Sequence, residues 1–250
     1  TKGFYEMLKG AHDMDNHVKT APARQNMAMM MAGLRVYYRN VQNRSAHGIM
    51  AYDQRLSDFT RWAQQTEMES NGKSVDRNGQ KLDYFTSPII WGEAGTGAQH
   101  SFFQALHQEA DICPLDILVP LQPVPDYRDE SFQESHKMLL INALAQAEAF
   151  AQGQVNQAEP HRHFEGGRPT SFISWRATTP YALGRLLSLY EHVTIASGFL
   201  WDVNSFDQFG VELGKSMAHA LASVQEVDDM PAQFSAAARA FMARLPKDAL

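Results

Sequence analysis

Residues 87–100, SPIIWGEAGTGAQH, contain the pattern that decides the fold of this chain. The apolar run at residues 87–92 predicts a buried strand, the glycines after it predict a turn, and a helix is expected to begin near Ala98. This succession is typical of layered α/β proteins, and it offers free backbone N–H groups to an anion at the start of the helix. Because glycines alone are a weak signal, the stretch indicates a fold and not yet a function.

The same alternation of strands and helices extends along the chain on both sides. Further strands are expected at residues 47–53, 112–121 and 170–175, and helices at residues 134–152 and from Pro180 onward. Strands separated by helices that are longer than the connections predict an α/β layered sheet. No internal repeat, linker or low-complexity tract divides the sequence, which indicates one domain.

An early helix that follows Pro22 is apolar almost all round, from Met27 to Tyr38. Such a composition predicts a helix that is buried on every side. Its methionines are expected to fill the core and not to bind a ligand.

The composition indicates a soluble globular protein. Hydrophobic residues make up 44% of the 250 residues, enough for a sizeable core. A net charge of −6 without a run of Lys and Arg argues against nucleic acid or an anionic membrane as the main partner, and no apolar run approaches the roughly 18 residues of a membrane span. Cys113 is the only cysteine, so no internal disulfide is possible, and it is expected to be a small buried residue. We therefore expect a cytoplasmic, unanchored protein.

A helix expected from Leu56 to the stop at Asn71 places Gln65 and Glu69 on one face of its final turn. The negative end of the helix dipole disfavours an ionised carboxylate there, which favours Glu69 as a proton acceptor. The alternative interpretation is a solvated surface glutamate.

His100 is expected in the first turn of the helix that follows the glycine turn. The positive end of the dipole favours a neutral imidazole there, which can accept a proton from one group and pass it to another. His107 lies seven residues later, but no third ligand follows at metal spacing, so we predict no metal site.

Residues 198–215, GFLWDVNSFDQFGVELGK, end an apolar run at a polar turn and begin a new helix. Ser205 and Gln208 have the spacing of a capping box at its start. Gln208 and Lys215 fall on one face of this helix, so Lys215 is a lone lysine on an otherwise apolar element. The alternative is an ordinary solvated lysine.

Three segments resemble motifs of the glucose-6-phosphate isomerase family. Residues 198–215 are similar to its C-terminal motif position for position, and residues 68–73 repeat its Met-Glu-Ser-Asn-Gly-Lys motif. Residues 92–100 resemble its Gly-Glu-Pro-Gly-Thr-Asn-Gly-Gln-His motif, with Ala94 in place of Pro and Gly97-Ala98 in place of Asn-Gly. Shorter similar segments extend the resemblance over nearly the whole chain.

The resemblance implies a three-layer α-β-α sandwich, a sugar-isomerase (SIS) domain with extra helices, formed by residues 1–250. It also implies the interconversion of glucose 6-phosphate and fructose 6-phosphate in glycolysis and gluconeogenesis, through an enediol(ate) intermediate and without a metal or nucleotide cofactor. The expected partners are the sugar phosphates and a second copy of the chain in a homodimer, and neither nucleic acid nor a membrane.

The family's residue roles can be carried over to the matching positions. Glu69 is then the base that moves a proton between C2 and C1, and His100 and Lys215 open the sugar ring, His100 from the neighbouring subunit. Gln65 and Gln208 match glutamines near the substrate. We expect all of these except His100 to converge at one cleft at the ends of the strands, where open α/β sheets bind ligands.

The sequence departs from the family in one respect that matters for activity. The family's earlier SIS domain, with a Ser/Thr-rich phosphate loop and a Gly-Gly-Arg motif, is absent; Arg168 follows two glycines but belongs to a different motif. The chain is therefore expected to be the C-terminal half of a longer enzyme and inactive alone. The alternative is a non-catalytic sugar-phosphate-binding SIS module, and the presence together of Glu69, His100 and Lys215 favours the enzyme.

Overall fold

The structure, a computed structural model, describes residues 1–124, 129–224 and 227–245. The chain divides into two compact units, Thr1–Phe206 and Asp207–Leu250. Each unit has its own cluster of buried hydrophobic residues. The boundary falls inside the stretch 198–215, although no change in composition marks a linker there.

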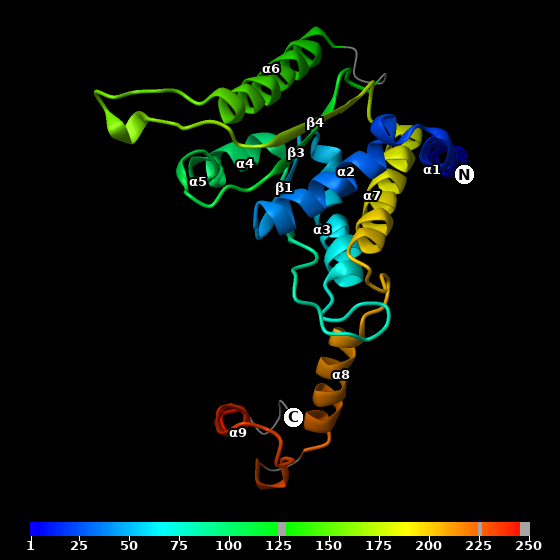
Figure 1. Ribbon diagram of the computed structural model, residues 1–250, viewed down its shortest axis with the longest axis vertical. Helices are drawn as coiled ribbons and strands as arrows, with labels where there is room; N and C mark the ends of the chain where they lie inside the picture. The colour runs from blue at the N-terminus through cyan, green and yellow to red at the C-terminus, as the bar shows by residue number, and fades with distance from the viewer. Residues whose placement is uncertain (125–128, 225–226, 246–250) are drawn as a thin grey trace. The chain divides into compact units, whose positions relative to one another are not determined.

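A parallel four-stranded sheet with the order β2-β1-β3-β4 forms the centre of the first unit (Figure 1). The strands are β1 (Ala46–Ala51), β2 (Ile89–Trp91), β3 (Leu115–Pro120) and β4 (Thr170–Trp175). The four expected strands are thus confirmed, with small differences at their ends. Every residue of β3 is buried, because helices cover both faces of a parallel sheet.

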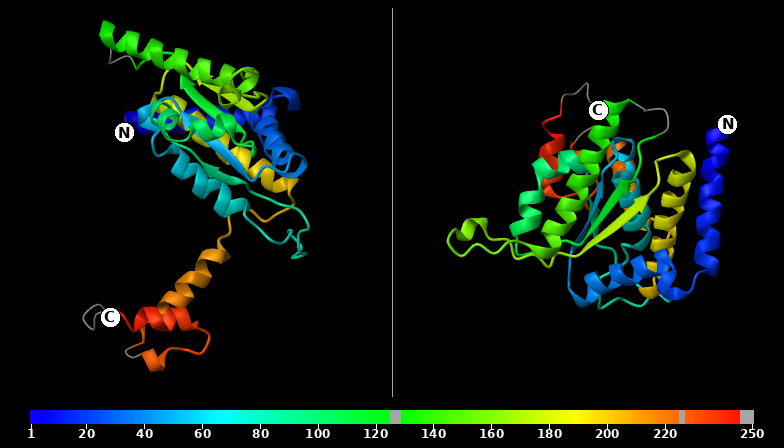
Figure 2. Two further views of the ribbon diagram at one scale, coloured as in Figure 1. Left: turned by 90° about the vertical axis from the view of Figure 1, so that its left-hand side faces the viewer. Right: turned by 90° about the horizontal axis from the view of Figure 1, so that it is seen from above.

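Helices form a layer on each face of the sheet (Figure 2). One layer contains α1 (Lys2–Thr20), α2 (Met27–Val36), α3 (Phe59–Gln64) and α7 (Pro180–Leu200), and the other contains α4 (Gly95–Ser101), α5 (Phe103–Gln108) and α6 (Glu130–Gln152). Short 3₁₀ turns occur at Ala23–Gln25, Gln54–Leu56 and Pro160–Arg162, and π-turns at Tyr37–Val41 and Gln65–Glu69. The expected three-layer α-β-α sandwich is confirmed.

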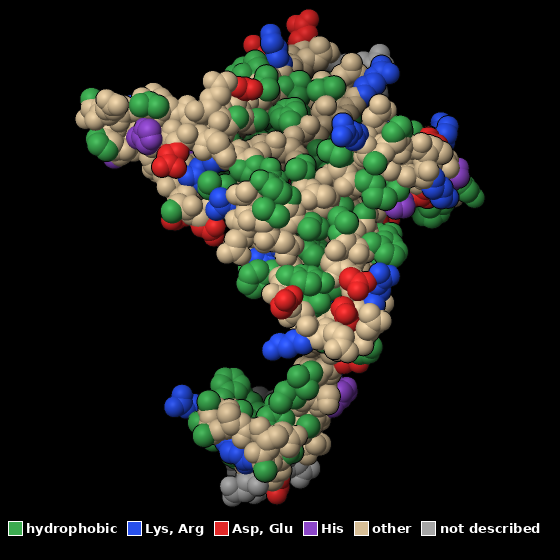
Figure 3. All heavy atoms as spheres, viewed as in Figure 1, with side chains coloured by type: hydrophobic (Ala, Val, Ile, Leu, Met, Phe, Trp, Pro, Cys, Tyr) green, Lys and Arg blue, Asp and Glu red, His purple; other side chains and the backbone are tan. Residues whose placement is uncertain are grey.

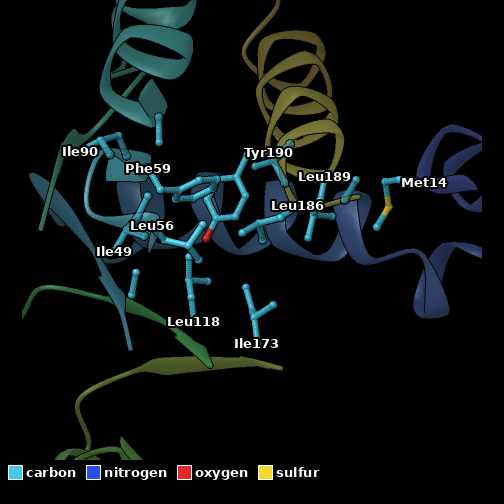
Figure 4. Close-up of a cluster of buried hydrophobic side chains, with 14 residues drawn as sticks. Met14, Ile49, Leu56, Phe59, Ile90, Leu118, Ile173, Leu186, Leu189 and Tyr190 are labelled. Carbon is cyan, nitrogen blue, oxygen red and sulfur yellow. The ribbon is translucent and has the colours of Figure 1, made fainter. Parts of the chain in front are cut away.

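The central strands build both cores by pointing alternate side chains to opposite faces. Ile49 and Leu118 pack with the layer of α3 and α7 (Figure 4). Met50 and Ile117 pack with the layer of α4 to α6. The central strands β1 and β3 are therefore shielded from water on both faces, whereas the edge strands β2 and β4 are partly exposed.

We expected α2 to be buried on every side, and it is not. Only Ala28, Ala32 and Arg35 are buried, whereas Met29 is 48% and Met30 47% exposed. The prediction is wrong because α2 packs on α7 with one side and no described element covers the other. Hydrophobic side chains are accordingly visible at the surface where α2 lies (Figure 3).

α1 and α7 approach each other closely at two glycines. A Cβ atom on Gly10 would lie 1.9 Å from the Tyr181 carbonyl oxygen, and one on Gly184 would lie 1.9 Å from the Met7 carbonyl oxygen. Only a residue without a Cβ fits at either position.

We expect Gly184→Ala to lower the free energy of unfolding by about 1–3 kcal/mol, because the added methyl group forces α1 and α7 apart. Gly33→Ala is the matched control: a Cβ on Gly33 in α2 would meet no atom within 4 Å, and alanine is favoured over glycine in a helix by up to about 1 kcal/mol. Urea denaturation of both variants measures the difference. A Gly184→Ala variant as stable as the wild type contradicts the close crossing.

The second unit contains α8 (Phe209–Ala222), a 3₁₀ turn (Val227–Asp229) and α9 (Ala236–Met242). Its small core comprises Val224, Met230, Phe234 and Met242. α8 itself has no buried residue. Within the described ranges, none of the helices combines the length and the apolar character needed to cross a lipid bilayer.

Candidate functional site

Gln65 and Glu69 are the first and last residues of the π-turn that continues α3. π-turns are rare and frequently occur at functional sites. The helix ends at Asn71, so the predicted position of Glu69 in its last turn is confirmed. Gln65 is exposed and Glu69 is half-buried.

The end of this helix is fixed by Asn71, which is fully buried. Its Nδ2 donates to the carbonyl oxygen of Thr194 in α7 at 2.8 Å, and its Oδ1 accepts from the Ser205 hydroxyl at 2.5 Å. Lys73 Nζ donates to the carbonyl oxygen of Glu69 at 3.0 Å. The backbone around Glu69 is therefore held in place, while no described residue forms a hydrogen bond or ion pair with its carboxylate.

Ser205 does not cap α8. That helix begins at Phe209, and its N-cap residue Gln208 forms no side-chain cap bond. The predicted capping box is wrong because Asn71, distant in sequence, takes the Ser205 hydroxyl. The next residue, Phe206, has a φ of 69°, which is rare for a bulky side chain and is typical of functional segments.

The helix end that carries Glu69 lies beside the beginning of β2. The backbone N–H of Ile90 donates to Met68 Sδ at 3.4 Å, and that of Ser87 to the Asn71 carbonyl oxygen at 3.5 Å. We expected this site at the ends of the strands where open α/β sheets bind ligands. Such sheets bind ligands at the carboxyl ends, whereas Glu69 lies beside the beginning of β2. A crossover helix between parallel strands runs antiparallel to them, so its last turn returns to the edge where the next strand begins.

His100 lies beyond the opposite ends of the strands. α4 begins at Gly95, directly after Ala94 bridges to Ala51 at the end of β1. His100 is exposed and lies in the last turn of α4, because the glycines expected in the turn are already helical. The predicted placement in the first turn, and the dipole effect derived from it, are wrong. One copy of the first unit does not bring His100 and Glu69 together.

Gln208 and Lys215 belong to the second unit. Gln208 precedes α8 and Lys215 lies within it, and both are exposed. Their convergence with Gln65 and Glu69 at one substrate stays a prediction.

A cavity of about 370 Å³ lies at the carboxyl ends of the central strands. Residues that follow β1, β2 and β3 line it, among them Asp53, Arg55 and Thr96. This is the point where the chain leaves β1 and β3 in opposite directions, a common ligand position in open sheets. None of the site residues predicted from the sequence lines this cavity.

Other chemically reactive residue types have structural roles. Arg168 is buried and donates to the Glu109 carbonyl oxygen at 2.7 Å. Burial raises the pKa of the Cys113 thiol to about 11, so this cysteine is not a nucleophile near neutral pH. The ring of His107 stacks on Phe150 with 4.1 Å between the ring centroids. In the part of the chain that the structure describes, no three His, Cys, Asp or Glu residues are grouped to hold a metal ion.

Sequence reasoning missed a buried ionic cluster behind the π-turn. It joins Arg35, His47, Glu67, Asp116 and Tyr190. Its members come from separate elements, so no local spacing indicates it. The only available signal is the presence of charged residues within apolar segments.

Three comparisons with known proteins agree on the family. The model of the phosphoglucose isomerase family matches residues 1–242. A glucose-6-phosphate isomerase of Methylocella silvestris is 43% identical over 239 residues, which cover 88% of this chain and 43% of that protein. One of Deinococcus radiodurans is 44% identical over 228 residues, which cover 86% of this chain and 41% of that protein. This chain therefore spans less than half the length of these relatives.

Solved structures show the same similarity. The crystal structure of a glucose-6-phosphate isomerase from Chlamydia trachomatis has a TM-score of 0.82 and 36% identity, covering 98% of this chain and 44% of that chain. A hypothetical protein from Thermus thermophilus has a TM-score of 0.69 and 26% identity, covering 88% of this chain and 50% of that chain. With its fold and 242 of its residues matched, the chain belongs to the phosphoglucose isomerase family.

Proposed function

We propose that this chain is the catalytic-base half of a glucose-6-phosphate isomerase, which interconverts glucose 6-phosphate and fructose 6-phosphate. The observation that carries the proposal is the setting of Glu69. This half-buried carboxylate lies in a family motif, on a helix end fixed by Asn71, and no described residue engages it. Such a group is available to take a proton from a bound sugar.

The reaction moves a carbonyl group from C1 to C2 of the open-chain sugar. Glu69 removes the proton from C2 as the C1 carbonyl becomes the enediol(ate), and then returns a proton to C1 as the carbonyl forms at C2. The proton that moves between the two oxygens balances the step, so no electron acceptor is needed. A base beside both carbons is therefore the essential group.

Ring opening and sugar binding involve further residues. We assign ring opening to His100 and Lys215 and contacts with the sugar to Gln65 and Gln208, by their positions in the family motifs. Within one chain, His100 and Glu69 lie beyond opposite ends of the strands. His100 therefore acts in the active site of a second copy of the chain. The proposed enzyme is therefore a homodimer, working in glycolysis and gluconeogenesis in the cytoplasm.

The test is an assay of the longer protein that also contains the family's phosphate-binding half. In a host that lacks its own isomerase, we expect this protein to form fructose 6-phosphate from glucose 6-phosphate. Measured binding of both sugar phosphates without turnover contradicts the enzyme and supports the non-catalytic SIS module.

A further inference from the structure

The ionic cluster behind the π-turn connects five elements of the first unit. Arg35 of α2 pairs with Glu67 of the π-turn at 3.0 Å and lies 3.8 Å from Asp116 of β3. His47 Nε2 of β1 lies 3.0 Å from Asp116, and the Tyr190 hydroxyl of α7 donates to Asp116 at 3.0 Å. The π-turn is thereby joined to the sheet through Arg35.

Burying such charges is costly. The side chains of Arg35, Glu67 and Asp116 are at most 4% exposed, and moving an ion pair into the interior often stabilises no more than apolar residues of the same size. Burial opposes ionisation of Asp116, but His47 and Arg35 lower its pKa to about 2, so it remains an anion beside Arg35. Arg35 is therefore held between two buried carboxylates by ion pairing, at a cost in desolvation that an apolar contact would not carry.

Glu67 and Glu69 leave the same turn in nearly opposite directions, because side chains two residues apart in a helix point to opposite faces. Their burial agrees: Glu67 is 3% exposed, whereas Glu69 is half-buried. Glu67 is thus the inward anchor of the turn whose outer side presents Glu69.

We infer that the Arg35–Glu67 ion pair positions Glu69, by fixing the rotation of the π-turn relative to the sheet. The π-turn departs from the regular helical hydrogen-bond pattern, and Arg35–Glu67 is the ion pair on its inward side, in addition to the Asn71 contacts at the helix end. A displacement of about 1 Å between a base and its substrate can cost about a hundredfold in rate. The inference rests on the proposed function, and Arg35 and Glu67 are positioning residues that touch no substrate.

The first test is Glu67→Gln in the longer, active protein, since glutamine keeps the size and removes the charge. We expect kcat to fall about tenfold to a hundredfold while KM changes less than about twofold, because the displaced group acts in the chemical step. Asp15→Asn is the matched control: it removes an ion pair with His192 (2.8 Å) that lies between α1 and α7 and does not involve the π-turn. Its kcat is expected to equal that of the wild type.

A double variant separates positioning from stability. Arg35→Met with Glu67→Met replaces the ion pair by apolar side chains, while Asp116 keeps its contacts with His47 and Tyr190. We expect this variant to fold and to have a reduced kcat. A wild-type kcat in either Glu67→Gln or the double variant overturns the inference. If one of the two variants does not fold, the kcat of the other one tests the inference. If the wild type does not isomerise, or Glu69→Gln does, the proposed function fails instead, so the two failures are distinguishable.

Discussion

Replacing Glu69 by glutamine in the longer protein is expected to slow proton exchange at C2 of the sugar phosphate by about 10²- to 10⁴-fold. Glutamine has the same shape as glutamate but cannot accept the proton. The backbone of Glu69 is held by Asn71 and Lys73, independently of the Glu69 side chain. We therefore expect the backbone of the site to be unchanged in the variant and sugar-phosphate binding to be retained.

Exchange can be followed by proton NMR in heavy water, and binding by calorimetry. Glu148→Gln is the matched control, because it makes the same chemical change on the exposed side of α6. Glu148→Gln is expected to exchange at the wild-type rate. Undiminished exchange by Glu69→Gln removes Glu69 from the role of base, whatever the family resemblance implies.

The fold could be predicted from the sequence to the extent that it is encoded locally. β4 has the bounds expected from its alternation, and the helix that carries Glu69 ends at the Asn-Gly signal. Both features follow from side chains near in sequence: alternation of period two for a strand, and a residue that favours chain reversal for a helix end. The parallel direction of the strands then follows from the helical crossovers between them.

The sequence-based predictions are wrong where the local structure depends on a residue that is distant in the sequence. Ser205 has the spacing of a helix cap, but its hydroxyl bonds with Asn71, more than a hundred positions away in the sequence. α2 has apolar residues on all sides, which predicts full burial. Its burial, however, depends on which other elements pack against it. The ionic pair of Arg35 and Glu67 is likewise invisible to any local pattern.

The position of Glu69 at the beginning of β2 is a different case, since the sequence held enough information to predict it. Once a strand, a helix and a second parallel strand are assigned, the last turn of the helix must return to the amino edge of the sheet. The segment directly after a strand, such as the one that leads from β2 to His100, must lie at the carboxyl edge. Topology alone therefore separates Glu69 from His100 within one chain, and this separation supports the homodimer that we propose.

The 250-residue chain, purified alone, is expected to fold and yet to show no measurable isomerisation of glucose 6-phosphate. Folding is expected because one hydrophobic cluster lies on each face of the central strands. Catalysis is expected to fail because, in the family, the phosphate loop and the Gly-Gly-Arg arginine come from the other SIS domain. Loss of one donor that stabilises developing charge costs about 10²- to 10³-fold, and loss of the phosphate contacts removes binding energy that orients the sugar.

Circular dichroism and a coupled assay of the purified chain measure the two parts of this prediction separately. Adding a separately expressed phosphate-binding half is expected to restore turnover, and adding the same half to the Glu69→Gln chain is not. This pair of mixtures matters because it assigns any recovered activity to Glu69 and not to the added half. Substantial turnover by the chain alone, prepared from a host without its own isomerase, means that these 250 residues contain a complete active site. The cavity beside Asp53 and Arg55 would then be the place to look for it.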